Sequence, residues 1–155
     1  IGVEPSLITR QRQNLGATRS RGLEFELQSR LTAFAEVALG YLLVDAEVRK
    51  FPANRSLEGL EVPQVPRHQA TFQISLGNVA VQARCIGSQF EDDQNQLKLG
   101  RYTVVDALFS RNLTKRLQGL LAVENLFDEQ YEIGKTPVTT VGPPRFVRIG
   151  IRFRR

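Results

Sequence analysis

The chain has 155 residues, a net charge of +5 and a single cysteine, and 41% of its residues are apolar. This length predicts about one domain, and no stretch approaches the roughly 20 apolar residues of a membrane-spanning helix. Composition therefore excludes a helical membrane protein, and the lone Cys85 excludes a disulfide framework and a Cys-x-x-Cys site. A membrane β-barrel stays possible, because its strands need only about 9–11 residues, of which every second one is apolar.

Alternation of apolar and polar residues dominates the chain and predicts an all-β fold. In residues 22–31, for example, Leu23, Phe25 and Leu27 fall on one face of a strand, and glutamates fall on the other. Several of the expected strands are longer than the usual 5–6 residues, as in a tall barrel wall. We expect about eight antiparallel strands, at residues 7–13, 17–31, 33–49, 67–76, 79–90, 101–112, 116–127 and 145–154.

The expected connections alternate in length. Tight turns at 31–33, 77–78 and 112–116 alternate with long loops at about 50–66, 91–100 and 128–144, which carry most of the Pro, Gly and charged residues. Outer-membrane barrels have short periplasmic turns and long outer loops. The pattern therefore predicts an up-and-down transmembrane β-barrel. A soluble β-sandwich also explains alternation, but it does not explain the strand lengths or the regular order of connections.

The two faces of these strands have different expected surroundings. The apolar face of a large barrel looks at lipid and the polar face looks into a wet lumen. We expect the following residues to face lipid: Leu23, Phe25, Leu27, Val37, Leu39, Tyr41, Leu43, Phe72, Ile74, Leu121, Val123, Val147, Ile149 and Ile151. We expect the following residues to face the lumen: Glu24, Glu26, Arg30, Glu36, Gln73, Gln82, Arg84, Asp106, Gln118, Glu124, Arg148 and Arg152.

Carboxylates and guanidinium groups recur on neighbouring strands of the polar face, so we expect bidentate ion pairs between them. Their expected role is a structural network that also docks a plug, and the alternative role is to line the path of a solute. Aromatic residues near strand ends, namely Phe90, Phe127, Tyr131 and Phe153, fit an interfacial girdle. Ordinary packing is the alternative for these aromatics.

The sequence offers little for catalysis, cofactors or metals. His68 has no second His or clustered Cys within ligand spacing, so we expect no transition-metal site. The acidic run at 91–93 is expected to be a solvated loop tip rather than a Ca²⁺ site. Arginines are spread along the chain and mixed with acids, so we expect no nucleic-acid partner. We expect no enzymatic activity and no cofactor.

The last forty residues carry the most distinctive pattern, and they resemble the C-terminal end of TonB-dependent outer-membrane receptors. In that family a strand ends in Asn-Leu-Phe-Asp-x-x-Tyr, and a loop leads to a Gly-x-Pro-Arg entry into a last strand that closes on an aromatic. The matching positions here are Asn125, Leu126, Phe127, Asp128, Tyr131, Gly142, Pro144, Arg145 and Phe153. Upstream, Gly22 and Glu24 match a recurrent Gly-hydrophobic-Glu strand. Arg154 and Arg155 follow Phe153, which departs from the family's terminal aromatic.

The resemblance implies the C-terminal segment of a larger barrel, and the plug domain of the family has no counterpart in the sequence. The first residue is Ile1, the chain has no Met, and no signal peptide is visible, so we expect a piece of a longer protein. By resemblance, the parent sits in the bacterial outer membrane and imports a scarce large solute, with a ferric siderophore expected ahead of cobalamin or glycans. Implied partners are outer-membrane lipid, the barrel-assembly machinery, and TonB acting through the plug.

Two other readings stay open. Eight strands are enough to close a small barrel, so a self-contained outer-membrane barrel with a structural or adhesion role is the first alternative. A soluble ligand-binding β-domain is the second. Under the favoured reading, loops 50–66 and 128–144 are expected to touch the solute.

Overall fold

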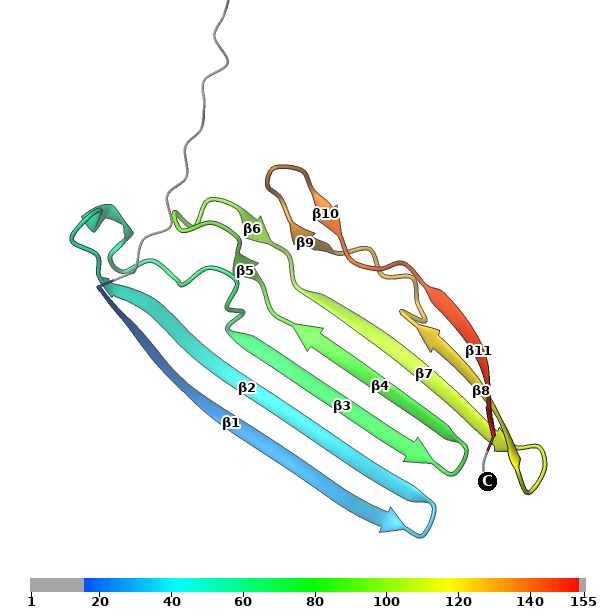
Figure 1. Ribbon diagram of the computed structural model, residues 1–155. Helices are drawn as coiled ribbons and strands as arrows, with labels where there is room; N and C mark the ends of the chain where they lie inside the picture. Colours follow the sequence, from blue (N-terminus) through cyan, green and yellow to red (C-terminus); the bar gives the residue numbers. More distant parts are fainter. Residues whose placement is uncertain (1–15, 154–155) are drawn as a thin grey trace, which may run out of the picture.

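One antiparallel sheet of seven strands makes up most of the protein, and the computed structural model describes residues 16–153 (Figure 1). Neighbouring strands of this sheet follow one another along the chain, with the two small hairpins skipped. The seven strands are β1 (Ala17–Thr32), β2 (Ala35–Lys50), β3 (His68–Leu76), β4 (Val79–Ile86), β7 (Tyr102–Asn112), β8 (Leu117–Glu124) and β11 (Phe146–Phe153). The prediction of an all-β, up-and-down arrangement is confirmed.

Seven of the eight expected strands correspond to these elements, and the expected strand 7–13 lies outside the described residues. Two expected ends are wrong. The strand expected at 79–90 ends at Ile86, and residues 89–90 pair elsewhere. The strand expected at 116–127 ends at Glu124, because Asn125 takes a left-handed φ of 50° that no strand can continue through.

The alternation of connections is confirmed. Tight turns at 33–34, 77–78 and 113–116 lie at one end of the sheet, and all three long connections lie at the other end (Figure 1). The long connections carry small elements that the alternation pattern does not reveal. These are a 3₁₀ turn η1 (Arg55–Leu57), a hairpin of β5 (Gln89–Phe90) with β6 (Lys98–Leu99), and a hairpin of β9 (Glu132–Gly134) with β10 (Thr140–Val141).

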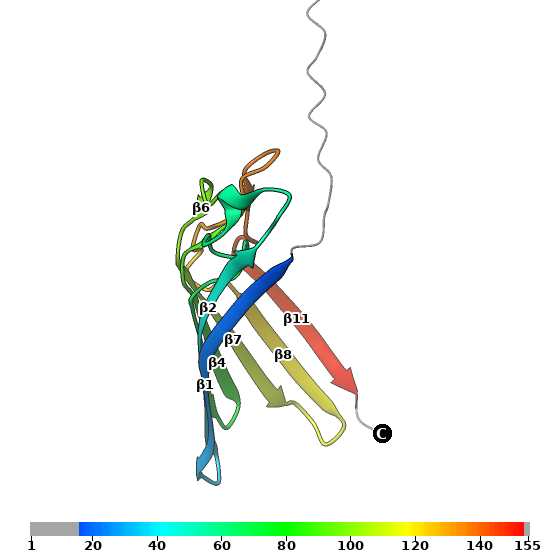
Figure 2. The ribbon, with the colours of Figure 1, turned by 90° about the vertical axis from the view of Figure 1, so that its left-hand side faces the viewer.

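The sheet is a curved, open wall. Seen along its β1 edge, it bends progressively, so that β8 and β11 turn away from the plane of β1 and β2 (Figure 2). Strands β1 and β11 form its two edges and do not pair with each other. Within residues 16–153, no helix has the length and apolarity that crossing a bilayer requires.

The described residues enclose very little core. Their buried apolar side chains are Ala35, Val48, Leu57, Leu99 and Val104. By contrast, Ile149 is 84% exposed, Ile151 73% and Leu23 71%, because no second layer covers the main sheet in the described part of the chain. A soluble sandwich would bury such residues between two sheets. The observed wall matches a barrel whose apolar face meets lipid.

Candidate functional site

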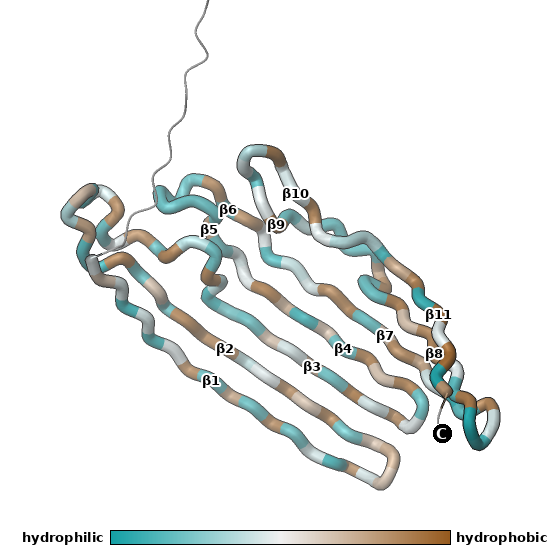
Figure 3. Tube along the Cα trace, in the orientation of Figure 1, coloured by the Kyte–Doolittle hydropathy of each residue, from teal (hydrophilic) through white to brown (hydrophobic). Residues whose placement is uncertain are grey.

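The strand register places the apolar residues on one continuous face. Phe25 pairs with Tyr41, Leu27 with Leu39, and Leu39 in turn with Phe72, so each apolar side chain lies beside another across the ladder. The hydropathy of the chain alternates along the strands in the same way (Figure 3). Every residue expected to face lipid falls on this face, which we call the apolar face.

The apolar face has a sharp outer limit. Leu23 pairs with Leu43, whereas the next same-face pair toward the long loops is Arg21 with Asp45. Below this limit, β2 presents apolar or small same-face residues over 35–43, which is about 26 Å of strand at roughly 3.3 Å per residue. A strand tilted by about 35–45° would therefore cover an apolar band of about 19–22 Å, which approaches the height of about 25 Å found in outer-membrane barrels.

The opposite face is polar and carries the residues that the sequence predicts for the lumen. Register puts all of these predicted residues on one side of the sheet. Three ion pairs form there: Arg30 with Glu36, Arg84 with Asp106 at 3.5 Å, and Arg148 with Glu124. Each guanidinium contacts a single carboxylate oxygen, so the expected bidentate geometry is wrong for these three pairs. Within residues 16–153, Glu24, Glu26 and Arg152 have no ion-pair partner. That this face looks into a lumen stays a prediction.

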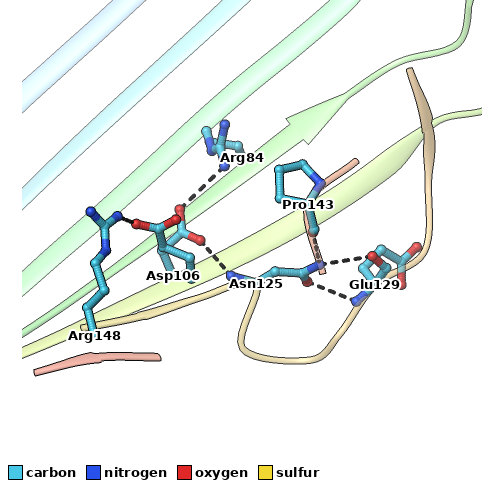
Figure 4. A network of polar contacts seen from close by, with 7 residues as sticks. Arg84, Asp106, Asn125, Glu129, Pro143 and Arg148 are labelled. Carbon is cyan, nitrogen blue, oxygen red and sulfur yellow. Dashed lines mark hydrogen bonds and ion pairs between the residues drawn. The ribbon is translucent and has the colours of Figure 1, made fainter. Parts of the chain in front are cut away.

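Asn125 is the centre of a polar network at the loop end of the polar face (Figure 4). Its backbone N–H donates to Asp106 Oδ1 at 2.9 Å, and Asp106 also pairs with Arg84. Its side-chain amide donates to the carbonyl oxygens of Glu129 and Pro143 at 2.9 and 3.0 Å, and its Oδ1 accepts the Glu129 N–H at 2.8 Å. Asn125 is only 3% exposed, so this full set of partners offsets the cost of burying an amide.

Other residues of the Asn-Leu-Phe-Asp-x-x-Tyr motif add contacts to this polar network, and we call the whole set of contacts the clasp around Asn125. Asp128 also has a left-handed φ, 56°, and its carboxylate accepts the Arg145 N–H at 2.8 Å. The Tyr131 ring stacks on Tyr102 with centroids 4.1 Å apart. Gly142 lies so close to the Tyr131 ring that a Cβ at this position would overlap it. The motif thus joins the exit from β8 to the entry into β11, and Asn125 and Asp128 turn the chain between these two strands.

The other residues of the motif have simpler places. The Leu126 N–H donates to the Val105 carbonyl at 2.7 Å, which extends the pairing of β7 with β8 by one bond. Phe127 is 72% exposed at the loop end of the wall, and Phe153 pairs with Leu117 at the opposite end. Both positions fit the aromatic girdles that the sequence predicts. Tyr131 instead packs against Tyr102, so for this residue the alternative of ordinary packing is correct.

Burial of Tyr131 raises the pKa of its phenol above the ordinary value of 10, and the neighbouring Tyr102 acts in the same direction. The phenol therefore stays protonated near neutral pH.

A steric reason also explains Gly22 in the upstream motif, because a Cβ at this position would overlap the Leu43 carbonyl oxygen of the neighbouring strand. Both motifs accordingly specify packing in the wall rather than chemistry.

The three long connections contact one another at the outer end of the sheet. The Gln64 N–H donates to the Phe90 carbonyl at 2.7 Å, and the Asn95 side chain binds both backbone groups of Glu61. The Glu91 carboxylate accepts hydrogen bonds from Lys135 and Thr136. The β5–β6 hairpin therefore holds residues 61–64 on one side and the β9–β10 hairpin on the other.

The expectation of a solvated acidic tip at 91–93 is wrong for two of its three residues. Asp92 accepts the N–H groups of Gln96 and Leu97 at 2.6–3.1 Å, and Glu91 binds the neighbouring loop. Partial burial raises the pKa of the Glu91 carboxyl, but the hydrogen bonds from Lys135 and Thr136 outweigh it, so this pKa lies below 4.5. Asn95 adopts a positive φ of 55° in the turn of this hairpin. The turn-forming residues Asp92, Asp93 and Asn95 are the signal in the sequence that could have found it.

The outer edge of the apolar face carries a shallow hollow of about 460 Å³. It is lined in part by Tyr41, His68, Cys85 and Arg101. The Tyr41 hydroxyl and His68 Nδ1 are hydrogen-bonded at 2.8 Å, so the isolated histidine has a local partner. The described residues contain no group of His, Cys, Asp and Glu side chains arranged to hold a metal ion.

Comparison with known proteins agrees with this geometry. The family described as "TonB dependent receptor-like, beta-barrel" matches residues 2–126. The ferrichrome outer membrane transporter/phage receptor of Escherichia coli is 33% identical over 129 residues, which are 75% of this chain and 17% of that protein. An uncharacterized TonB-dependent receptor of Haemophilus influenzae is 31% identical over 91 residues, which are 53% of this chain and 26% of that protein.

Solved structures show the same fold. The ferric yersiniabactin uptake receptor FyuA of Yersinia pestis superposes with a TM-score of 0.76 at 24% identity, over 88% of this chain and 23% of that one. The closed form of the ferric-catecholate import receptor Fiu of E. coli gives 0.72 at 25% identity, over 88% and 21%. The chain spans between 17% and 26% of the length of these curated and solved relatives. On the match over residues 2–126, the chain belongs to the family of TonB-dependent receptor β-barrels.

Proposed function

We propose that this chain forms the C-terminal part of the barrel wall of an outer-membrane receptor that imports a ferric siderophore with energy delivered through TonB. The observation that carries the proposal is the combination of an apolar band, close in height to that of outer-membrane barrels, with three long loops gathered at one end. The relatives of known role are named as receptors or transporters of iron complexes. The wall, its loops and its final strand would be this chain's contribution, without any catalytic role.

The polar network supports the same proposal. Paired charges such as Arg84 with Asp106 suit a wet interior, where a plug domain or a passing solute replaces water. The exposed apolar face requires lipid, and the open β1 and β11 edges require further strands of the barrel. Outer-membrane lipid, the barrel-assembly machinery and TonB are therefore the expected partners. The open edges also disfavour a self-contained barrel of adhesion type.

Uptake in cells tests this function. The longer receptor would be produced in a Gram-negative strain that lacks its own siderophore receptors, with radiolabelled ferrichrome as the first probe. Ferrichrome is chosen because the E. coli relative is named for it. We expect iron accumulation that disappears in a matched strain without TonB. Accumulation equal to the empty-vector strain, for ferrichrome and for catecholate and citrate complexes alike, would refute a role in siderophore import.

A further inference from the structure

The β5–β6 hairpin lies between the two loops that are expected to touch the solute. In Figure 1 it stands between the connection that contains η1 and the β9–β10 hairpin. It contains almost no apolar core of its own, except for Leu99, which is 1% exposed. Its polar side chains, however, make specific contacts with both neighbours. These contacts give the hairpin a role that the family match does not assign.

On one side, the hairpin holds the first long loop through Asn95. The Asn95 Oδ1 accepts the Glu61 N–H at 2.8 Å, and its Nδ2 donates to the Glu61 carbonyl at 3.0 Å. An amide side chain can satisfy a donor and an acceptor of one residue in this way, as a β-strand partner would. The Phe90 carbonyl accepts a further bond from the Gln64 N–H at 2.7 Å.

On the other side, the hairpin holds the last long loop through Glu91. One carboxylate oxygen accepts the Thr136 N–H at 3.2 Å and the Thr136 hydroxyl at 3.0 Å, and the other accepts the Lys135 N–H. A charged acceptor makes such bonds about twice as strong as neutral ones. The Glu91 N–H donates to the Leu97 carbonyl at 2.9 Å, so the side chain projects from a fixed backbone.

We propose that Glu91 and Asn95 are positioning residues, which fix residues 61–64 and the β9–β10 hairpin relative to each other so that both meet the same solute. This inference rests on the proposed function for its solute. The mechanical part of the inference does not rest on that function. Residues 89–99, which we call the strut, set the distance between the two loops whether or not a solute is bound. The Glu91 and Asn95 side chains act through the loops and touch no solute themselves.

The distance between the loops tests the mechanical part. Spin labels would be placed at Ala53 and Val138, which are exposed positions, in the longer receptor carrying Cys85→Ser. Glu91→Gln turns one accepting oxygen into an amide NH2 group, a donor that faces backbone donors, and Asn95→Ala removes both side-chain bonds to Glu61. Asp93→Asn is the matched control, because Asp93 is an exposed neighbour that makes none of these contacts. We expect a single narrow distance distribution in the parent protein and in the control, and a broadened one in both strut variants.

Hydrogen exchange and ferrichrome binding complete the test. In Glu91→Gln, we expect amide exchange at residues 135–136 to rise by about tenfold or more, as the loss of one charge-assisted hydrogen bond implies, and ferrichrome affinity to fall. Unchanged distances and exchange would overturn the strut. Altered exchange with unchanged affinity would overturn the positioning role, and lost affinity with unchanged exchange would mean that Glu91 contacts the solute directly. If the parent protein binds no ferric siderophore, the proposed function and the positioning role fail, while the distances still decide whether the strut exists.

Discussion

At the scale of single residues, the clasp around Asn125 explains why a polar residue closes an apolar strand. A left-handed φ of 50° favours Asn or Gly, and only Asn also supplies the amide that binds Glu129 and Pro143. Asp106 anchors the backbone of Asn125 from the neighbouring strand. One side chain therefore ends β8, starts the last loop and holds the entry into β11.

Asn125→Asp tests this clasp. The substitution places a buried carboxylate oxygen against two carbonyl oxygens, so we expect the folded receptor to lose about 2–4 kcal/mol of stability. Urea-induced unfolding in lipid vesicles would measure the loss. Asn78→Asp, in the exposed tight turn between β3 and β4, is the matched control and should be almost neutral. Equal stability of the two variants would contradict the role of the Asn125 amide.

The Glu91 contact predicts a pH dependence at the same scale. Its pKa is lowered on folding, so the stabilisation of the β9–β10 hairpin is fully present above about pH 4.5 and is lost as the pH falls through the lower, folded pKa. Amide resonances of isotope-labelled Lys135 and Thr136 should shift together with one midpoint below 4.5. Glu91→Gln should abolish that transition, and a midpoint above 4.5 would show that the hydrogen bonds do not favour the charged form.

At the scale of elements, the main strands could be predicted from alternation because burial in lipid and exposure to water sort residues with a strict period of two. The small hairpins could not. Strands β5, β6 and β10 have two residues each, which is too few for a periodic pattern. The contacts that hold the hairpins in place join residues far apart in the sequence, such as Asn95 with Glu61 and Glu91 with Thr136. Glu91 looked solvated because its hydrogen-bond partners, Lys135 and Thr136, lie 44 and 45 residues further along the chain.

The two faces of β3 give a direct test of the apolar band. Phe72 pairs with Leu39 and Ala83 on the apolar face, whereas Gln73 pairs with Ala38 and Gln82 on the polar face. Phe72→Arg should cost about 2–4 kcal/mol near the bilayer middle, and Gln73→Arg should cost far less. Unfolding from vesicles and the heat-sensitive mobility of the folded barrel on gels would report both. A larger loss for Gln73→Arg would reverse the assignment of the faces.

At the scale of the whole molecule, the sheet is a wall whose two long edges remain to be paired. Periodicity does not specify its neighbours in a closed barrel or the solute of the proposed receptor, because specificity depends on loop side chains that obey no repeat. The contacts of Glu91 and Asn95 nevertheless show that the outer loops form one connected group. The family signature, in contrast, marks the clasp at Asn125 and carries no information about the solute.

The central claim is that the outer loops of this wall bind the solute, and one measurement tests it most directly. In the longer receptor, residues 132–141 would be replaced by a short Gly-Ser link, which leaves Asn125, Asp128, Tyr131 and Gly142 in place. Equilibrium binding of a ferric siderophore that the parent receptor takes up would be compared with that of a control in which only the opposite turn, 113–116, is replaced. We predict that the first variant folds to the heat-sensitive barrel but binds the siderophore much more weakly, while the control binds normally. A folded barrel with unchanged affinity after replacement of 132–141 would contradict the account.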